Sequence, residues 1–186
     1  IVVNSQDEKS KEIKILEMIR QARVDGIIFI THHAHEYIDG NMPIVSVDRH
    51  LGNGVPFVTS NNYDASRKAV EYLIERGATK IGCICGSTKV ESEVSMRYKA
   101  YCDVMEERGL ERYLEVADFK HGEEMDVTDR YFKKYPDVDG LFVGSDMLAN
   151  AAYHSAMLLG KNVPRDLQVV GFDGVMDEWC PHPKLT

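Results

Sequence analysis

The feature that most constrains this chain is a repeated alternation of short apolar runs with longer amphipathic stretches. Apolar runs rich in β-branched residues are typical of strands inside a parallel sheet, and we expect those at 26–30 and 44–47 to be buried on both faces. The runs lie at residues 1–3, 26–30, 44–47, 81–85, 114–119, 141–144 and 169–172. Amphipathic stretches separate most of them, and several end at a glycine or before a proline. The alternation predicts an α/β fold with doubly wound parallel sheets flanked by helices.

The composition is that of an ordinary globular protein, since 44% of the 186 residues are apolar and 28% are charged. The formal net charge is −8 and the sequence pI is near 5.4. An acidic surface repels the phosphate backbone, so we do not expect this segment to bind nucleic acid by itself. No apolar run approaches the roughly 20 residues that a membrane-spanning helix needs, and we expect no membrane partner.

The sequence contains no pattern typical of a catalytic, cofactor or metal site. It has no G-x-S-x-G, no P-loop and no G-x-G-x-x-G after a strand, so we predict neither an enzyme nor a cofactor. His32, His33 and His35 lie in a predicted loop with no fourth ligand, which favours solvated side chains over a metal site. Cys83 and Cys85 lie two apart in an apolar run, which favours small buried side chains over a disulfide. Free thiols of this kind suit a reducing cytoplasm.

In doubly wound sheets, ligands bind in the crevice beyond the carboxyl ends of the strands. The residues directly after the strands are therefore the candidates for a binding site, and several of them are polar, as a small-molecule site requires. They are Asp48, Arg49, Ser60, Asn61, Gly86, Ser87, Phe119, Ser145, Asp146 and Asp173. Pattern and composition alone predict an α/β binding domain of unknown ligand.

Four segments, in order along the chain, resemble the lactose-repressor (LacI/GalR) family of transcription regulators. They are 42–49 (MPIVSVDR), 61–86 (NNYDASRKAVEYLIERGATKIGCICG), 139–152 (DGLFVGSDMLANAA) and 163–173 (VPRDLQVVGFD), the last followed by PKLT at 183–186. The resemblance spans nearly the whole chain and implies a two-lobe, periplasmic-binding-protein-like fold. It also implies a partial core. A helix-turn-helix headpiece, a hinge and the first core strand and helix would precede this segment, and the last strand and helices would follow it.

The resemblance implies a partial N-terminal lobe at 1–60, a C-terminal lobe at 61–174 and a crossover back to the first lobe at 175–186. A sugar-like effector would bind between the lobes and shift the population of their orientations. A homodimer would transmit this change to operator DNA through the headpieces, which makes the chain the sensing core of a cytoplasmic regulator. The alternative is an extracytoplasmic sugar-binding receptor of a transport system, which shares the two-lobe fold. The Asp-Arg strand end, VPRDLQVVGFD and PKLT favour the regulator.

The resemblance assigns ligand contacts first to Arg97 and Asp173. Arg97 lies in SMRYKAY, similar to an Arg-x-x-Gly stretch of the family in which Ala100 replaces the glycine. Its planar fork suits sugar hydroxyls or a carboxylate, and the alternative is a solvated helix arginine. Asp173, in GFDG, resembles the acid that follows the last strand of the second lobe. A carboxylate accepts hydrogen bonds from adjacent sugar hydroxyls, and the alternative is a helix N-cap.

Four further residues complete the predicted ligand set. Asp48 ends a strand of the first lobe, and it either contacts the ligand or fixes the loop that follows. Phe119 either stacks on a ligand ring or belongs to the core. Ser145 stands where the family commonly has Asn, and Asn61 stands where it has Asp, so the resemblance implies an unusual effector. We expect Asp146 to cap the helix that follows it.

Overall fold

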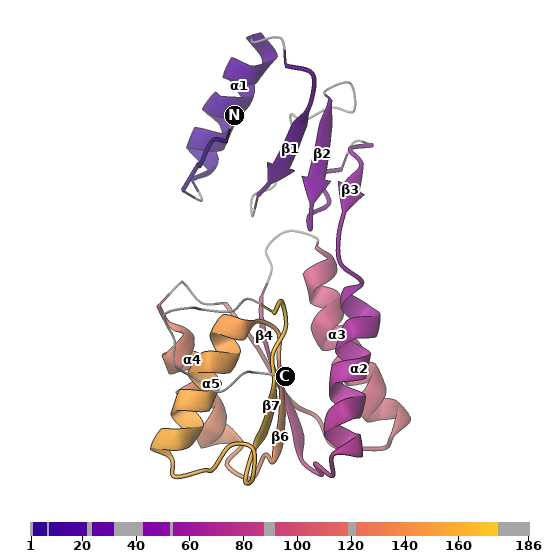
Figure 1. Ribbon diagram of the computed structural model, residues 1–186, viewed down its shortest axis with the longest axis vertical. Helices are drawn as coiled ribbons and strands as arrows, with labels where there is room; N and C mark the ends of the chain where they lie inside the picture. The colour runs from indigo at the N-terminus through magenta and orange to yellow at the C-terminus, as the bar shows by residue number, and fades with distance from the viewer. Residues whose placement is uncertain are drawn as a thin grey trace. The chain divides into compact units, whose positions relative to one another are not determined.

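The computed structural model describes residues 2–6, 8–21, 24–31, 43–52, 54–87, 92–118 and 122–174 (Figure 1). The described residues form two compact units. The first contains those up to Ser60 together with Ser92–Val94, and the second contains those of 61–87 and 95–174. Ser92–Val94 therefore joins the first unit, although it lies within the segment predicted as the C-terminal lobe. The sheet of each unit is parallel, as predicted.

The first unit consists of one α-helix and a three-stranded sheet in the order β1-β2-β3. Its elements are α1 (Lys9–Gln21), β1 (Ile27–Ile30), β2 (Ile44–Val47) and β3 (Phe57–Val58). Leu16 of α1 contributes to a small apolar core with Ile44, Leu51 and Val55. The buried carboxylate of Glu12 accepts a hydrogen bond from Thr31 Oγ1 at 2.7 Å, which ties the helix to the end of β1.

Two expectations for the first unit are wrong. Residues 2 and 3 are not in a strand, and Val2 is almost fully exposed. The runs at 26–30 and 44–47 are not buried on both faces, because Ile28, Ile30 and Val45 are 77%, 70% and 36% exposed. Ile27 and Phe29 pack against the core. Among the described residues, α1 is the one α-helix of this unit, and a single helix covers one face of a sheet.

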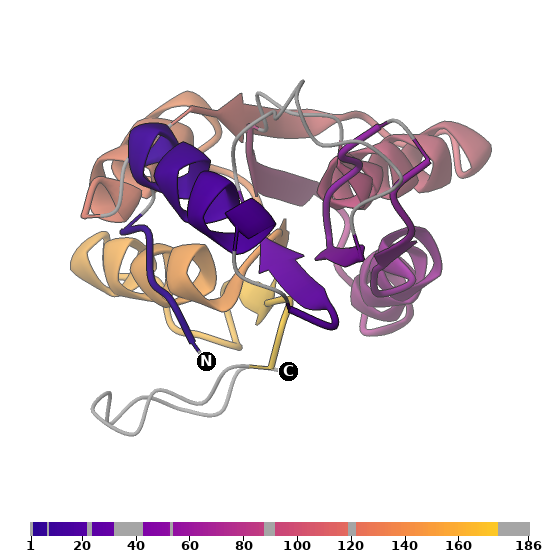
Figure 2. The same cartoon turned by 90° about the horizontal axis from the view of Figure 1, so that it is seen from above.

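The second unit is a four-stranded sheet in the order β5-β4-β6-β7 with two helices on each face. Its elements are α2 (Asn62–Glu75), β4 (Ile81–Gly86), α3 (Met96–Glu107), β5 (Tyr113–Ala117), α4 (Glu124–Lys134), β6 (Gly140–Val143), α5 (Asp146–Leu158) and β7 (Gln168–Val170). A 3₁₀ turn, Glu93–Ser95, precedes α3, and its first two residues belong to the first unit. Figures 1 and 2 show α2 and α3 packed on one side of the sheet and α4 and α5 on the other. This is the doubly wound arrangement that the sequence predicts.

The sequence of the central strand β4 is apolar throughout because both of its faces are buried. Ile81, Cys83 and Cys85 belong to the core under α2 and α3, whereas Ile84 belongs to the core under α4 and α5. Burial raises the pKa of the Cys83 thiol well above its ordinary value, and the adjacent Cys85 thiol adds to this effect. Cys83 therefore stays protonated, and both cysteines are free, buried side chains, as predicted.

Two tyrosine hydroxyls fix the pairing of β4 with β5. Tyr101 Oη donates to the Ile81 carbonyl at 2.9 Å and accepts from the Tyr113 backbone N–H at 2.8 Å. Tyr131 Oη donates to the Tyr113 carbonyl at 2.7 Å. This hydroxyl lies over Gly82, where a Cβ atom would be 1.8 Å from the oxygen. Gly82 is required by the close approach of Tyr131.

The substitution Gly82→Ala should lower the free energy of unfolding by about 1–3 kcal/mol, since the methyl group overlaps the Tyr131 hydroxyl. Tyr131→Phe in the same background should recover only part of this loss, because Cζ of the ring would still lie 3.0 Å from the new carbon. Chemical denaturation of the two single variants and the double variant measures the coupling. Strictly additive losses would contradict this packing.

Candidate functional site

Arg97 is the centre of a polar cluster in the second unit. It lies in the first turn of α3 and is only 8% exposed. A buried guanidinium is costly unless its N–H groups are directed at acceptors. The solvated helix arginine, the alternative that the sequence allowed, is therefore excluded.

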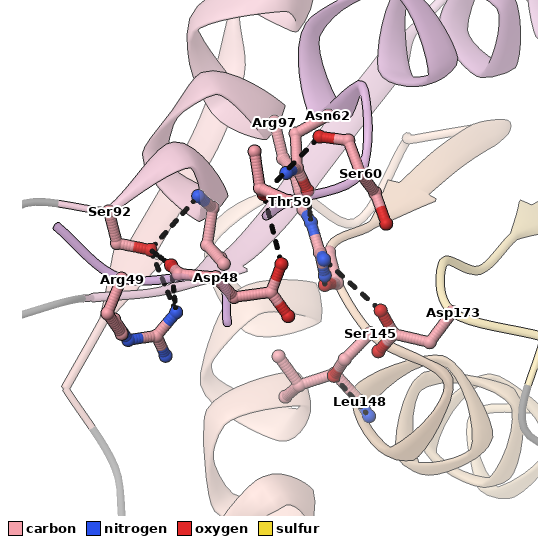
Figure 3. A network of polar contacts seen from close by, with 12 residues as sticks. Asp48, Arg49, Thr59, Ser60, Asn62, Ser92, Arg97, Ser145, Leu148 and Asp173 are labelled. Atoms are coloured by element: carbon pink, nitrogen blue, oxygen red, sulfur yellow. Dashed lines mark hydrogen bonds and ion pairs between the residues drawn. The ribbon is translucent and has the colours of Figure 1, made fainter. Parts of the chain in front are cut away.

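The guanidinium of Arg97 is held on three edges and on one face, and Figure 3 shows its contacts with Asn62 and Asp173. Its Nε donates to Oδ1 of Asn62 at 2.8 Å, and its Nη1 donates to the carbonyl oxygen of Gly144 at 2.6 Å. Its Nη2 forms an ion pair with Oδ1 of Asp173 at 3.2 Å. The Phe172 ring packs against the plane of the group, with its centroid 3.8 Å from Cζ. The start of α2 and the ends of β6 and β7 thus converge on one side chain.

The backbone around the ends of β6 and β7 leaves little room for side chains. A Cβ atom at Gly144 would lie 2.7 Å from the Cys85 sulfur, and one at Gly171 would lie 2.5 Å from Oδ1 of Asp146. Asp173 has a φ of 95°, in the region that favours glycine but admits Asp and Asn more readily than other residues. The two glycines allow the strand ends to approach closely, and the turn at Asp173 directs its carboxylate at Arg97.

The cluster presents both hydrogen-bond donors and an acceptor with little net charge. A guanidinium has five N–H donors, and the three contacts above use three of them; among the described residues, two N–H groups on the Nη atoms remain for a ligand. The Asp173 side chain is 37% exposed, so its carboxylate is accessible to a ligand. Since the cation and the anion are already paired, the arrangement suits a neutral ligand whose hydroxyl groups both donate and accept.

Two of the predicted ligand residues cap helices. Ser145 Oγ accepts from the Leu148 backbone N–H at 3.4 Å at the start of α5, so Ser145 and not Asp146 is the N-cap. Asn61 Oδ1 accepts from the Asp64 backbone N–H at 3.2 Å and caps α2. Whether Ser145 and Asn61 also contact a ligand remains a prediction.

Asp48 lies in the first unit, within a separate polar cluster (Figure 3). It has a φ of 59°, and its Oδ1 accepts from Thr59 Oγ1 at 3.0 Å. Its backbone carbonyl accepts from Arg49 Nη1 at 3.0 Å and from Ser92 Oγ at 3.1 Å, and Arg49 also donates to Ser92 Oγ at 2.9 Å. These contacts explain why Ser92–Val94 belongs to the first unit. A ligand contact of Asp48 remains a prediction.

Phe119 and the histidines at 32, 33 and 35 lie outside the described residues. Within the described ranges, no group of three or more His, Cys, Asp or Glu side chains could hold a metal ion. None of the helices in that part of the chain has the length and apolar character needed to cross a bilayer.

The sequence did not reveal the roles of Asn62, Phe172 or the Gly144 carbonyl. A signal for Asn62 was present in the Asn61–Asn62 pair, because only one of two adjacent residues can be the N-cap. The other enters the first turn of the helix, and in α2 it is 2% exposed and faces Arg97. The backbone carbonyl of Gly144 has no sequence signal.

Comparison with known proteins places this chain in a family. Residues 1–180 match the family model described as periplasmic binding proteins and sugar binding domain of LacI family. The ribose operon repressor of Halalkalibacterium halodurans is 36% identical over 177 residues, which cover 94% of this chain and 53% of that protein. The ribose operon repressor of Bacillus subtilis is 29% identical, covering 98% of this chain and 56% of that protein. The chain thus spans about half the length of these curated relatives.

A solved structure has the same fold. It is a periplasmic binding protein/LacI transcriptional regulator from Alkaliphilus metalliredigens in complex with D-xylulofuranose, with a TM-score of 0.79 and 28% identity over 93% of this chain and 65% of that one. The predicted periplasmic-binding-protein-like α/β fold and the resemblance to LacI-family regulators are therefore confirmed. The two curated relatives named above are both ribose operon repressors, and this favours the regulator over the transport receptor.

The capping role of Ser145 can be tested by stability. Ser145→Ala should lower the free energy of unfolding by about 1 kcal/mol, because the first turn of α5 loses its acceptor. Ser145→Asn should retain wild-type stability within about 0.5 kcal/mol, since Asn is an equally good N-cap. Urea denaturation followed by circular dichroism measures both. An Ala variant as stable as the wild type would refute the cap.

Proposed function

This chain belongs to the LacI-type family of periplasmic-binding-protein-like sugar-binding domains, and from that premise we propose that it is the sugar-sensing part of a transcriptional repressor. The observation that carries this proposal is the Arg97 cluster at the ends of β6 and β7. A sugar that binds one conformation of the protein more tightly shifts the population towards it. Operator DNA would be bound by a segment outside residues 1–186, and the coupling free energy links the two sites.

The proposed ligand is a small neutral sugar of pentose size. Asp173 already balances the charge of Arg97, so an anionic ligand would meet a carboxylate as well as the guanidinium. Hydroxyl groups can accept from the two remaining N–H donors of Arg97 and donate to Asp173. Three similar proteins agree with this size, since two are ribose operon repressors and one structure holds D-xylulofuranose, whereas others are named for sucrose or hold cellobiose.

The remaining parts of the proposal rest on the family resemblance. The two units would be the two lobes, with 175–186 leading back to the first, and Asp48, Asn61, Phe119 and Ser145 would add ligand contacts. The regulator would act as a homodimer and would have no catalytic role. A cytoplasmic location is supported by the free thiols of Cys83, Cys85 and Cys102.

In the complete natural protein, D-ribose or D-xylulose should bind at least about tenfold more tightly than D-ribose 5-phosphate, because the ion-paired site disfavours an added anion. Arg97→Ala should weaken sugar binding by about tenfold to a hundredfold, as expected for the loss of charged hydrogen bonds. Isothermal titration calorimetry measures both effects.

The matched control is Arg67→Ala. Arg67 is also an ion-paired helix arginine, bound to Glu71 at 3.0 Å and to Glu107 at 2.6 Å, but it lies on α2 outside the cluster. Its removal should leave sugar affinity unchanged. Equal effects of the two substitutions, or tighter binding of the phosphate ester, would refute the assignment of the site.

A DNA-binding measurement separates the regulator from the transport receptor. The complete protein should enrich specific fragments from sheared genomic DNA of its own organism, and the sugar that binds should change its affinity for them. The Arg97→Ala protein should bind the same fragments without responding to the sugar. Sugar binding with no enrichment of DNA would instead support the transport receptor.

A further inference from the structure

We propose that Asn62 is a positioning residue of the ligand site, whose amide oxygen holds the Arg97 guanidinium in the orientation that receives the sugar. The ligand part of this inference rests on the proposed function. The contact itself does not, since Nε of Arg97 donates to Oδ1 of Asn62 at 2.8 Å and both side chains are buried.

The Nε contact differs from the other contacts of Arg97 in what it restrains. A ring stacked under the guanidinium, as Phe172 is, keeps the plane at a fixed height but allows the group to turn within that plane. A hydrogen bond from Nε is directional, and it fixes the edge of the guanidinium that is bonded to Cδ. With that edge fixed, Nη1 faces the Gly144 carbonyl and Nη2 faces the Asp173 carboxylate, so the orientation of the whole guanidinium is set.

The Asn62 side chain is not needed to cap helix α2, so it is available to bind Arg97. Asn61 already caps the helix by accepting from the Asp64 backbone N–H, so the amide of Asn62 is not needed for the same purpose. Asn62 is 2% exposed, and its oxygen is directed at α3 rather than at solvent. Because α2 and α3 pack along each other, the start of one helix can hold a side chain at the start of the other.

If Asn62 holds the Arg97 guanidinium in place before the ligand binds, its removal should lower the affinity for the ligand. If the guanidinium is free to turn, binding must restrict it again, and affinity falls although no direct ligand contact is lost. Asn62→Ala in the complete protein should therefore weaken binding of D-ribose or D-xylulose by about tenfold, the cost of leaving a buried charged donor without its acceptor. Asn62→Asp keeps an oxygen of the same reach and should restore binding to within about threefold of the wild type.

The matched control is Ser66→Ala. Ser66 lies one turn further along α2, is fully buried, and its hydroxyl has no hydrogen-bond partner, so its removal should change neither affinity nor the state of Arg97. A double-mutant cycle excludes a merely structural effect. In an Arg97→Ala background, Asn62→Ala should cause no further loss of affinity, because its effect passes through Arg97. Losses that add fully would overturn the proposal.

A measurement without ligand keeps the inference separate from the proposed function. The Arg97 Nε–H proton should exchange slowly with water in ¹⁵N-resolved NMR spectra of the wild type, Asn62→Asp and Ser66→Ala proteins. It should exchange at least about tenfold faster in Asn62→Ala, where the acceptor is gone. Asn62→Ser, whose shorter hydroxyl does not reach Nε, replaces the Ala variant if that variant does not fold.

The outcomes of the two measurements are distinguishable. Unchanged exchange in the variant that lacks the acceptor would overturn the positioning role whatever the ligand is. If the wild-type protein bound neither sugar, the proposed function would fail, while faster exchange in Asn62→Ala would still establish that Asn62 positions Arg97.

Discussion

The burial of one guanidinium constrains much of the second unit. Arg97 is 8% exposed, and a charge at that depth costs several kcal/mol unless protein atoms replace its water. The replacements come from three places in the fold, namely the start of α2, the carbonyl after β6 and the carboxylate after β7. These places meet only because β6 lies between β4 and β7 in the sheet and because α2 packs beside α3. The burial of the Arg97 charge therefore depends on the strand order of the sheet.

The sequence predicted the second unit well because β4 and β6 are apolar on both faces and three of its helices, α2, α3 and α5, are followed by glycines. In β4, Ile81 and Cys83 pack in one core and Ile84 packs in the other, while Gly82 allows the close contact with Tyr131. The run was correctly predicted as a strand, but its central position in the sheet was not predicted. The pairing of Arg97 with Asp173 was not predicted, although both residues were assigned to the site. They lie far apart in the chain, and a side-chain pair of this kind follows from strand order, which periodicity does not encode.

Prediction was weaker where a local pattern has two physical solutions. An apolar run such as 26–30 is compatible with burial on one face or on two, and in the first unit Ile28 and Ile30 are exposed. Adjacent polar residues present the same ambiguity. Ser145 and Asp146 can both cap α5, and Asn61 and Asn62 can both cap α2, so only the backbone angles decide which residue of each pair does so.

The internal pairing of Arg97 with Asp173 has a consequence for how a sugar-responsive repressor would behave in changing surroundings. Binding of a neutral ligand to a site without net charge releases no counterions, and an ion pair with one buried partner is screened less by salt than a pair between two exposed side chains. DNA binding is the opposite case, because each neutralised phosphate releases ions and affinity falls steeply as salt rises. For the proposed repressor, a rise in ionic strength would thus weaken DNA binding while the affinity for sugar stayed the same.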